Sequence, residues 1–277
     1  MLTAVNIANI MVLEGVDCLL CVDAADANLA LAHLRQYEVE NRPTPVVRVV
    51  ARVHPHAWVG VVLYALVLLG VAFAISAGIW RPEAFENGAL DAGRVQHGQW
   101  WRAWTALTLH LDANHIVANL GGGIWFGYLA ARQLGTGTAW FLIVTGAALA
   151  NVLEAVLGPA THQSVGASTA VFTALGLMAA HSWRTRLPLR LSWARRWAPL
   201  IAGAVLLGWL GAAGGTGDEL AHVDVVAHVL GFAVGCLFGA TAGLPGVARI
   251  IDRVPQWLAG TAALASLAIA WALALSQ

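Results

Sequence analysis

Seven long apolar stretches follow one another after residue 52, and they constrain the fold more than any other feature of the chain. They lie at Ala57–Trp80, Ala113–Ala131, Thr138–Leu157, Val165–Ser182, Pro199–Ala213, His222–Gly243 and Gln256–Leu275. A helix needs about 20 such residues to cross the hydrocarbon core of a bilayer. Charged residues make up only 11% of the 277 residues, against about a quarter in a soluble domain. The sequence therefore predicts an all-α, polytopic membrane helix bundle with seven spans.

The arginines predict how these spans are oriented. All 15 basic residues are arginines. Apart from Arg35 in the amino-terminal region, a cytoplasmic amino terminus would place eleven of them beside the inner ends of the spans, with only Arg81, Arg94 and Arg102 outside. Cytoplasmic loops of multi-pass proteins carry such an excess of basic residues. We therefore expect the amino terminus in the cytoplasm. The last span is the only one whose loss would leave this pattern intact.

Residues 1–52 come before the first span and predict a small cytosolic region. Within it, the leucines and alanines of residues 23–38 have partly helical spacing, with Asp23 and Asp26 as caps near the start, which predicts a helix. A short strand is expected over residues 12–22. Cys18 and Cys21 form a CxxC pair, but without a second pair we expect ordinary reduced cysteines. No basic start with an apolar run and cleavage site is seen, so no signal peptide is expected. The remaining chain is divided into a six-span core, 53–245, and an additional span within 246–277.

Four polar residues inside the spans are the candidates for function, because polar groups are costly in hydrocarbon and commonly have a role there. Ser168 lies at the outer start of the fourth span, His228 near the start of the sixth, and His115 and Asn119 one helical turn apart in the second. The predicted orientation makes these three spans run from outside to inside. We therefore expect all four side chains at a similar depth, in the outer part of the membrane.

These residue types suit the hydrolysis of an amide bond. A serine hydroxyl attacks well only when a base takes its proton, and a neutral histidine can take that proton near neutral pH. We therefore predict Ser168 as the nucleophile and His228 as the general base, in a dyad, because the sixth span carries no carboxylate beyond His228. The oxyanion of the intermediate needs waiting donors. The Ser168 backbone N–H, the Asn119 amide and the His115 imidazole are suitable donors.

The order and spacing of these residues resemble those of the rhomboid intramembrane serine proteases over roughly residues 57–245. The resemblance rests on Trp101-Arg102, on His110 through His115 to Asn119, on Gly166-x-Ser168, and on Ala227-His228 followed by Gly231 and Gly235. It implies a Ser168–His228 dyad, an oxyanion hole lined by His115 and Asn119, and structural roles for Trp101, Arg102, Gly166, Gly231 and Gly235. It also implies transmembrane proteins as substrates and a bacterial inner membrane as the location. Arg102 is expected to extend toward lipid headgroups.

Thr169 departs from the family motif, because the usual Gly-x-Ser-Gly has glycine at that position. It keeps open an inactive rhomboid-like protein that binds transmembrane segments without cutting them. A transporter with a histidine relay would need symmetric halves or broken helices, which the sequence does not clearly show. A metal or haem protein would use His110, His115, His222 and His228, which lack acidic partners at ligand spacing. We expect no cofactor, no metal and, from a net charge of zero, no nucleic-acid partner; the oligomeric state is open.

Overall fold

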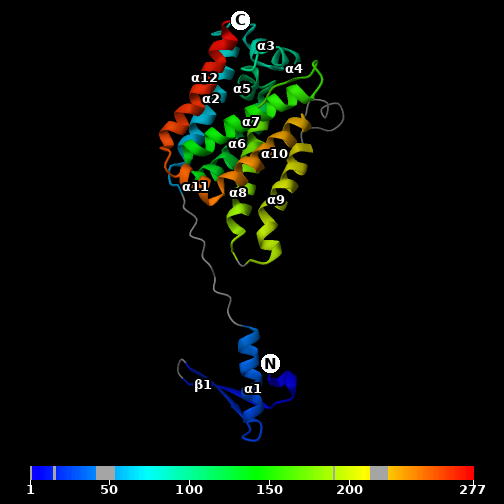
Figure 1. The fold of residues 1–277 in the computed structure, drawn as a ribbon, viewed down its shortest axis with the longest axis vertical. Helices are drawn as coiled ribbons and strands as arrows, with labels where there is room; N and C mark the ends of the chain where they lie inside the picture. The colour runs from blue at the N-terminus through cyan, green and yellow to red at the C-terminus, as the bar shows by residue number, and fades with distance from the viewer. Residues whose placement is uncertain (1, 15–16, 42–53, 190, 213–223) are drawn as a thin grey trace. The chain divides into compact units, whose positions relative to one another are not determined.

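A computed structural model describes residues 2–14, 17–41, 54–189, 191–212 and 224–277 (Figure 1). The chain forms two compact units, Met1–Val49 and Val50–Gln277. The smaller unit contains a short 3₁₀ helix, two strands and one α-helix. The larger unit contains all of the long apolar helices and the candidate functional residues. His222, together with the loop that precedes it, lies outside the described residues.

The smaller unit is a hairpin with one helix. The 3₁₀ helix η1 (Leu2–Val5) precedes antiparallel strands β1 (Asn9–Glu14) and β2 (Asp17–Val22) and helix α1 (Ala27–Glu40). Leu2, Ile7 and Ala30 form its small apolar core. The expectation of a single strand over residues 12–22 is wrong, because residues 12–14 end β1 and residues 17–22 form β2, which pairs antiparallel with β1.

The CxxC pair lies on β2. Cys18 and Cys21 are exposed, free thiols. Successive side chains of a strand point to opposite faces, so two residues three positions apart face in opposite directions. The strand geometry therefore holds these two thiols apart, in agreement with ordinary reduced cysteines.

The larger unit is a bundle of long helices, one at each of the seven expected stretches (Figure 1). These helices are α2 (Ala57–Ser76), α6 (Ala113–Leu134), α7 (Thr136–Leu157), α8 (Ser168–Arg186), α9 (Trp193–Ala212), α10 (Val225–Ala242) and α12 (Gln256–Leu275), with a short α11 (Pro245–Ile251) before the last. Among the described residues, α2, α7, α10 and α12 are both long and apolar enough to cross a membrane. Helices α6, α8 and α9 reach 22, 19 and 20 residues but are more polar. The chain is thus a polytopic helical membrane protein.

The connection between α2 and α6 folds into small elements at one end of the bundle, beside the end of α12 (Figure 1). These elements are α3 (Ala84–Gly88), β3 (Leu90–Asp91), α4 (Ala92–Gln96), α5 (Arg102–Thr105) and the 3₁₀ helix η2 (Ala106–Thr108). Strand β3 pairs with β4 (Gln163–Ser164), which lies just before α8. The α2–α6 connection is therefore tied directly to the segment that leads into Ser168.

Helices α8 and α10 form the most extensive helix contact of the bundle. Their backbones touch because Gly231, Gly235 and Gly239 lie four residues apart on one face of α10. A β-carbon at Gly235 would collide with the Thr173 carbonyl, and one at Gly239 with the Leu177 carbonyl. Small residues permit this close approach in membrane proteins, as the sequence predicted for these glycines.

We predict that Gly235→Val destabilises the protein, because a branched side chain has no room against the backbone of α8. Overpacking of this kind costs about 1–3 kcal/mol. The control is Gly70→Val on α2, where a β-carbon meets nothing within 4 Å. Thermal unfolding of the purified protein in detergent should show a lower midpoint for the Gly235 variant alone. Equal midpoints for the two variants would contradict the packing described for α8 and α10.

Candidate active site

The starts of α6, α8 and α10 lie together at one end of the bundle. The Gly166 N–H donates to the Ala106 carbonyl at 3.0 Å, which holds the start of α8 against η2. His162, in the segment before α8, lies 3.1 Å from the Asp224 carboxylate, the N-cap of α10. Helix α6 begins just after η2, with Asp112 as its N-cap. We call this region the Ser168 end of the bundle; it is the arrangement that the parallel direction of these spans predicted.

The side chains of Ser168 and His115 both lie beside Gly166. A β-carbon placed on Gly166 would stand 2.8 Å from His115 Nε2 and 3.6 Å from Ser168 Oγ. Gly166 has φ +140°, in the region that residues with a β-carbon avoid. Glycine is therefore required here for two reasons: its backbone conformation, and the space that the imidazole fills. This explains the first residue of the Gly-x-Ser motif in physical terms.

Ser168 is also the first residue of α8. The N–H groups of the first helical turn have no carbonyl one turn earlier to accept them. The positive end of the helix dipole lies at the same place. The Ser168 backbone N–H is therefore a donor at a position where negative charge is stabilised.

His228 lies on the glycine-lined face of α10, three residues before Gly231, and is 7% exposed. Its ring packs on Phe172 with the ring centroids 4.4 Å apart. Phe172 is four residues after Ser168, which is one helical turn along α8. The glycines thus let α10 approach α8 closely enough to place the imidazole of His228 within a turn of the serine.

Asn119 is buried in α6, one turn after His115, with 5% of its surface exposed. Its side-chain Nδ2 donates to the His115 backbone carbonyl at 3.0 Å. The backbone carbonyl of Asn119 accepts from the Tyr64 hydroxyl of α2 at 2.8 Å. An amide group has two N–H donors, so one remains after the bond to His115. Sequence reasoning did not foresee Tyr64, which fixes this part of α6 from the neighbouring helix.

Thr169 fits the helix packing. It is 4% exposed, and its Cγ2 lies 3.2 Å from the point where a β-carbon on Gly231 would stand. Its carbonyl accepts from the Thr173 hydroxyl at 2.7 Å. The extra bulk relative to glycine therefore occupies the interface between α8 and α10, where Gly231 leaves room for it.

His110 packs beside the site without being one of the four candidates. Its ring lies 5.0 Å from that of His115 at 72°, and its Nε2 lies 3.5 Å from the Ala167 N–H. Burial, and then the nearness of His115, lower the pKa of His110 to about 4, against smaller effects of Thr108 and Asp112. His110 is therefore neutral at physiological pH, as an acceptor at Nε2 has to be.

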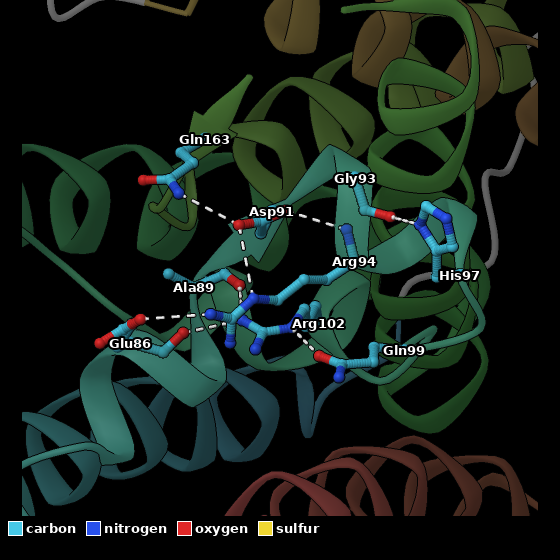
Figure 2. Close-up of polar contacts among 9 residues, drawn as sticks. All are labelled: Glu86, Ala89, Asp91, Gly93, Arg94, His97, Gln99, Arg102 and Gln163. Carbon is cyan, nitrogen blue, oxygen red and sulfur yellow. Dashed lines mark hydrogen bonds and ion pairs between the residues drawn. The ribbon is translucent and has the colours of Figure 1, made fainter. Parts of the chain in front are cut away.

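Arg102 does not reach lipid headgroups, so that expectation is wrong. It is 1% exposed and donates to Gln99 Oε1 at 2.6 Å and to the carbonyls of Glu86 and Ala89 at 2.7 and 2.8 Å (Figure 2). The rigid guanidinium fork provides several donors in fixed directions. Arg102 therefore joins α3 to α5 from inside the α2–α6 connection.

Asp91 strengthens the pairing of β3 with β4. Its carboxylate accepts from the Arg94 N–H at 2.9 Å and from Gln163 Nε2 at 3.1 Å (Figure 2). Burial opposes its ionisation, but the bonds from Arg94 and Gln163 and the nearby arginines hold the pKa of Asp91 below its ordinary value. This carboxylate thus fastens β4, which ends four residues before Ser168.

Comparison with known proteins identifies the family of this chain. Residues 97–244, just over half of the chain, match the Rhomboid domain. The chain belongs to the rhomboid family. It is 31% identical over 156 residues to RHOMBOID-like protein 1 of Arabidopsis thaliana, covering 55% of this chain and 37% of that protein. It is 25% identical over 159 residues to Rhomboid protease GluP of Bacillus subtilis, covering 57% and 29%. The chain thus spans about a third of the length of these relatives.

Helix α12 lies outside the matched residues, yet it contacts the site region of this rhomboid. The Trp271 Nε1–H donates to Thr108 Oγ1 at 3.0 Å in a buried position. Thr108 in turn donates to the Thr105 carbonyl, and the Thr105 hydroxyl donates to the Gly88 carbonyl at 2.6 Å. A chain of hydrogen bonds therefore connects the last span to the α2–α6 connection.

We predict that His110 makes the stability of this rhomboid depend on pH between about 6.5 and 4. The unfolded chain takes up a proton that the folded site excludes, so the free energy of unfolding falls as pH drops through this range. His110→Gln should reduce that slope in chemical unfolding measured at several pH values. His97→Gln, an exposed histidine of the same connection, should keep it; a slope unchanged in the His110 variant would refute the assignment.

We predict that Trp271→Phe destabilises the protein by about 1–2 kcal/mol, because it leaves the buried Thr108 hydroxyl without its donor. Trp257→Phe on the same helix is the matched control, since Trp257 is 71% exposed. Unfolding in detergent measures both. Adding Thr108→Val to Trp271→Phe should cost less than the sum of the single changes, and strict additivity would show that the bond does not contribute.

Proposed function

We propose that this rhomboid is an intramembrane serine endopeptidase that hydrolyses peptide bonds in or near transmembrane segments. The observation that carries the proposal is the convergence of Ser168 Oγ and His115 Nε2 on Gly166, with His228 packed one helical turn away on Phe172. The match to the Rhomboid domain and the similarity to a protein named as a rhomboid protease support it. A binding or transport function would leave this grouping of a serine with two histidines unexplained.

In the proposed reaction, Ser168 Oγ bonds to the carbonyl carbon of the scissile peptide while its proton passes to His228. The carbonyl oxygen becomes an oxyanion that accepts from the Ser168 backbone N–H, the free N–H of Asn119 and the His115 ring. Collapse of the intermediate breaks the C–N bond, and His228 gives its proton to the leaving amine. Water then hydrolyses the acyl-enzyme by the same route in reverse.

The two residues act as a dyad in this proposal. The nearest carboxylate on α10 belongs to Asp224, one turn before His228. Its Oδ1 caps the helix by accepting from the Ala227 N–H at 3.0 Å, and its Oδ2 lies 3.1 Å from His162. Both oxygens of Asp224 therefore have partners other than His228.

The membrane setting is part of the proposal. Seven crossings with a cytoplasmic amino terminus would place the Ser168 end near the outer surface of a bacterial inner membrane, in contact with lipids. Its substrates would be transmembrane proteins with a small residue before the scissile bond and a helix weakened by glycine or proline. A helical backbone must unwind there, because its carbonyls are otherwise occupied by hydrogen bonds.

An inactive rhomboid-like protein is the alternative, and Thr169 is the residue that suggests it. The packing of Thr169 against Gly231 weakens this alternative. The side chain fills space between two helices, away from Gly166, beside which Ser168 Oγ and His115 Nε2 both lie.

We predict that a fluorophosphonate probe labels the wild-type protein at Ser168. Ser168→Ala should lose labelling, and His228→Ala should reduce it to background because no base activates the serine. Ser182→Ala, on the same helix but bonded to Gln133, should label normally. Asn119→Ala should label and fold but lower kcat on a transmembrane substrate by about 10²–10³-fold. Undiminished labelling of Ser168→Ala would overturn the proposal.

A further inference from the structure

Two carboxylates and a histidine form a second cluster at the Ser168 end of the bundle. Glu154 comes from the last turn of α7, His162 from the segment before β4, and Asp224 from the N-cap of α10. One oxygen or nitrogen from each lies within 4.8 Å of those of the other two. His162 Nε2 is 3.1 Å from Asp224 Oδ2 and 3.5 Å from Glu154 Oε1. None of the three residues belongs to the proposed dyad or oxyanion hole.

The Glu154 carboxylate is a buried member of this cluster. Glu154 is 3% exposed, and among the described residues its oxygens make no hydrogen bond of ordinary geometry. The groups that approach them are His162, Asp224 and the Ala227 N–H. A buried carboxylate is costly unless it is paired with charge or bound to a metal. No arginine of the described part of the chain forms an ion pair with Glu154 or Asp224.

The spacing of the cluster fits a small divalent ion. Zinc binds histidine nitrogen and carboxylate oxygen at about 2.0–2.2 Å in a tetrahedron, whose ligand atoms therefore lie about 3.3–3.6 Å apart. The two separations from His162 Nε2, 3.1 and 3.5 Å, are close to that value. Two carboxylates would neutralise the charge of the ion. An imidazole ligand favours zinc and similar transition metals over calcium or magnesium, which prefer oxygen alone.

The ligand positions are fixed before any ion binds. The His162 carbonyl accepts from the Ala92 N–H at 3.0 Å, and the His162 N–H donates to the Pro159 carbonyl at 2.9 Å. Asp224 uses Oδ1 for its helix cap and keeps Oδ2 for the cluster. The side chains of His162 and Asp224 are 27% and 19% exposed, so an ion from solution has access and a water can complete the coordination.

We propose that Glu154, His162 and Asp224 form a binding site for a divalent transition-metal ion of the zinc class. The ion connects the end of α7, the segment that leads into Ser168, and the start of α10, one turn before His228. Its role is structural: it replaces the repulsion between two carboxylates by bonds to a common centre. The site thereby stabilises the relative positions of the two helices that carry Ser168 and His228.

Zinc binding to the full chain in detergent tests this proposal without any measurement of proteolysis. Protein stripped with a chelator is titrated with zinc alone by calorimetry and is then unfolded by heat with and without zinc. We expect one zinc ion per chain and a higher unfolding midpoint in its presence. Absence of binding, or binding without any shift of the midpoint, would overturn the proposal.

Variants locate the site. Glu154→Gln, His162→Ala and Asp224→Asn should each weaken zinc binding by at least about tenfold, and Asp224→Asn keeps an oxygen for the helix cap. His97→Ala, an exposed histidine of the α2–α6 connection, should bind zinc as the wild type does. If Glu154→Gln and His162→Ala bind zinc normally, the ion is held elsewhere and the proposal fails. If zinc does not bind the wild type, and Glu154→Gln is at least as stable as the wild type, a proton shared by the carboxylates takes the place of the metal and the proposal fails.

Discussion

The backbone contact between α8 and α10 determines the geometry of the site region. Carbonyls of α8 lie where β-carbons of α10 would otherwise be, at Gly231, Gly235 and Gly239. The distance between the helices is therefore set by main-chain atoms, which cannot change rotamer. Ser168 at the start of one helix and His228 near the start of the other inherit that fixed separation. Thr169 is accommodated in the same interface, because the glycine opposite has no side chain.

The long helices were predictable from the sequence because each depends on a local run of apolar residues, and the structure has a helix at every expected stretch. The grouping of Ser168 with His115 was also predictable, since spans that run in one direction bring their starts to one end. The hairpin was not foreseen: residues 12–22 were expected to form one strand, but β1 and β2 are two strands that pair with each other.

Contacts between distant segments could not be predicted from the sequence. The sequence around Arg102 does not show whether its guanidinium reaches headgroups or binds the backbone carbonyls of Glu86 and Ala89. Every residue has a backbone carbonyl, so such partners cannot be recognised from residue types. Glu154 and Asp224 did leave a signal, as the carboxylates inside the expected spans. They lie in different expected spans, and only the folded chain shows that they meet at His162. His162 lies in a loop, and nothing in the sequence indicated that it would bring Glu154 and Asp224 together.

The bond from Trp271 to Thr108 has a consequence for how the chain matures. The two residues are separated by 163 positions, so the buried Thr108 hydroxyl gains its donor only after α12 has packed against the bundle. Closing so long a loop comes late in folding. A chain whose synthesis has not reached α12 therefore lacks this buried hydrogen bond at the α2–α6 connection.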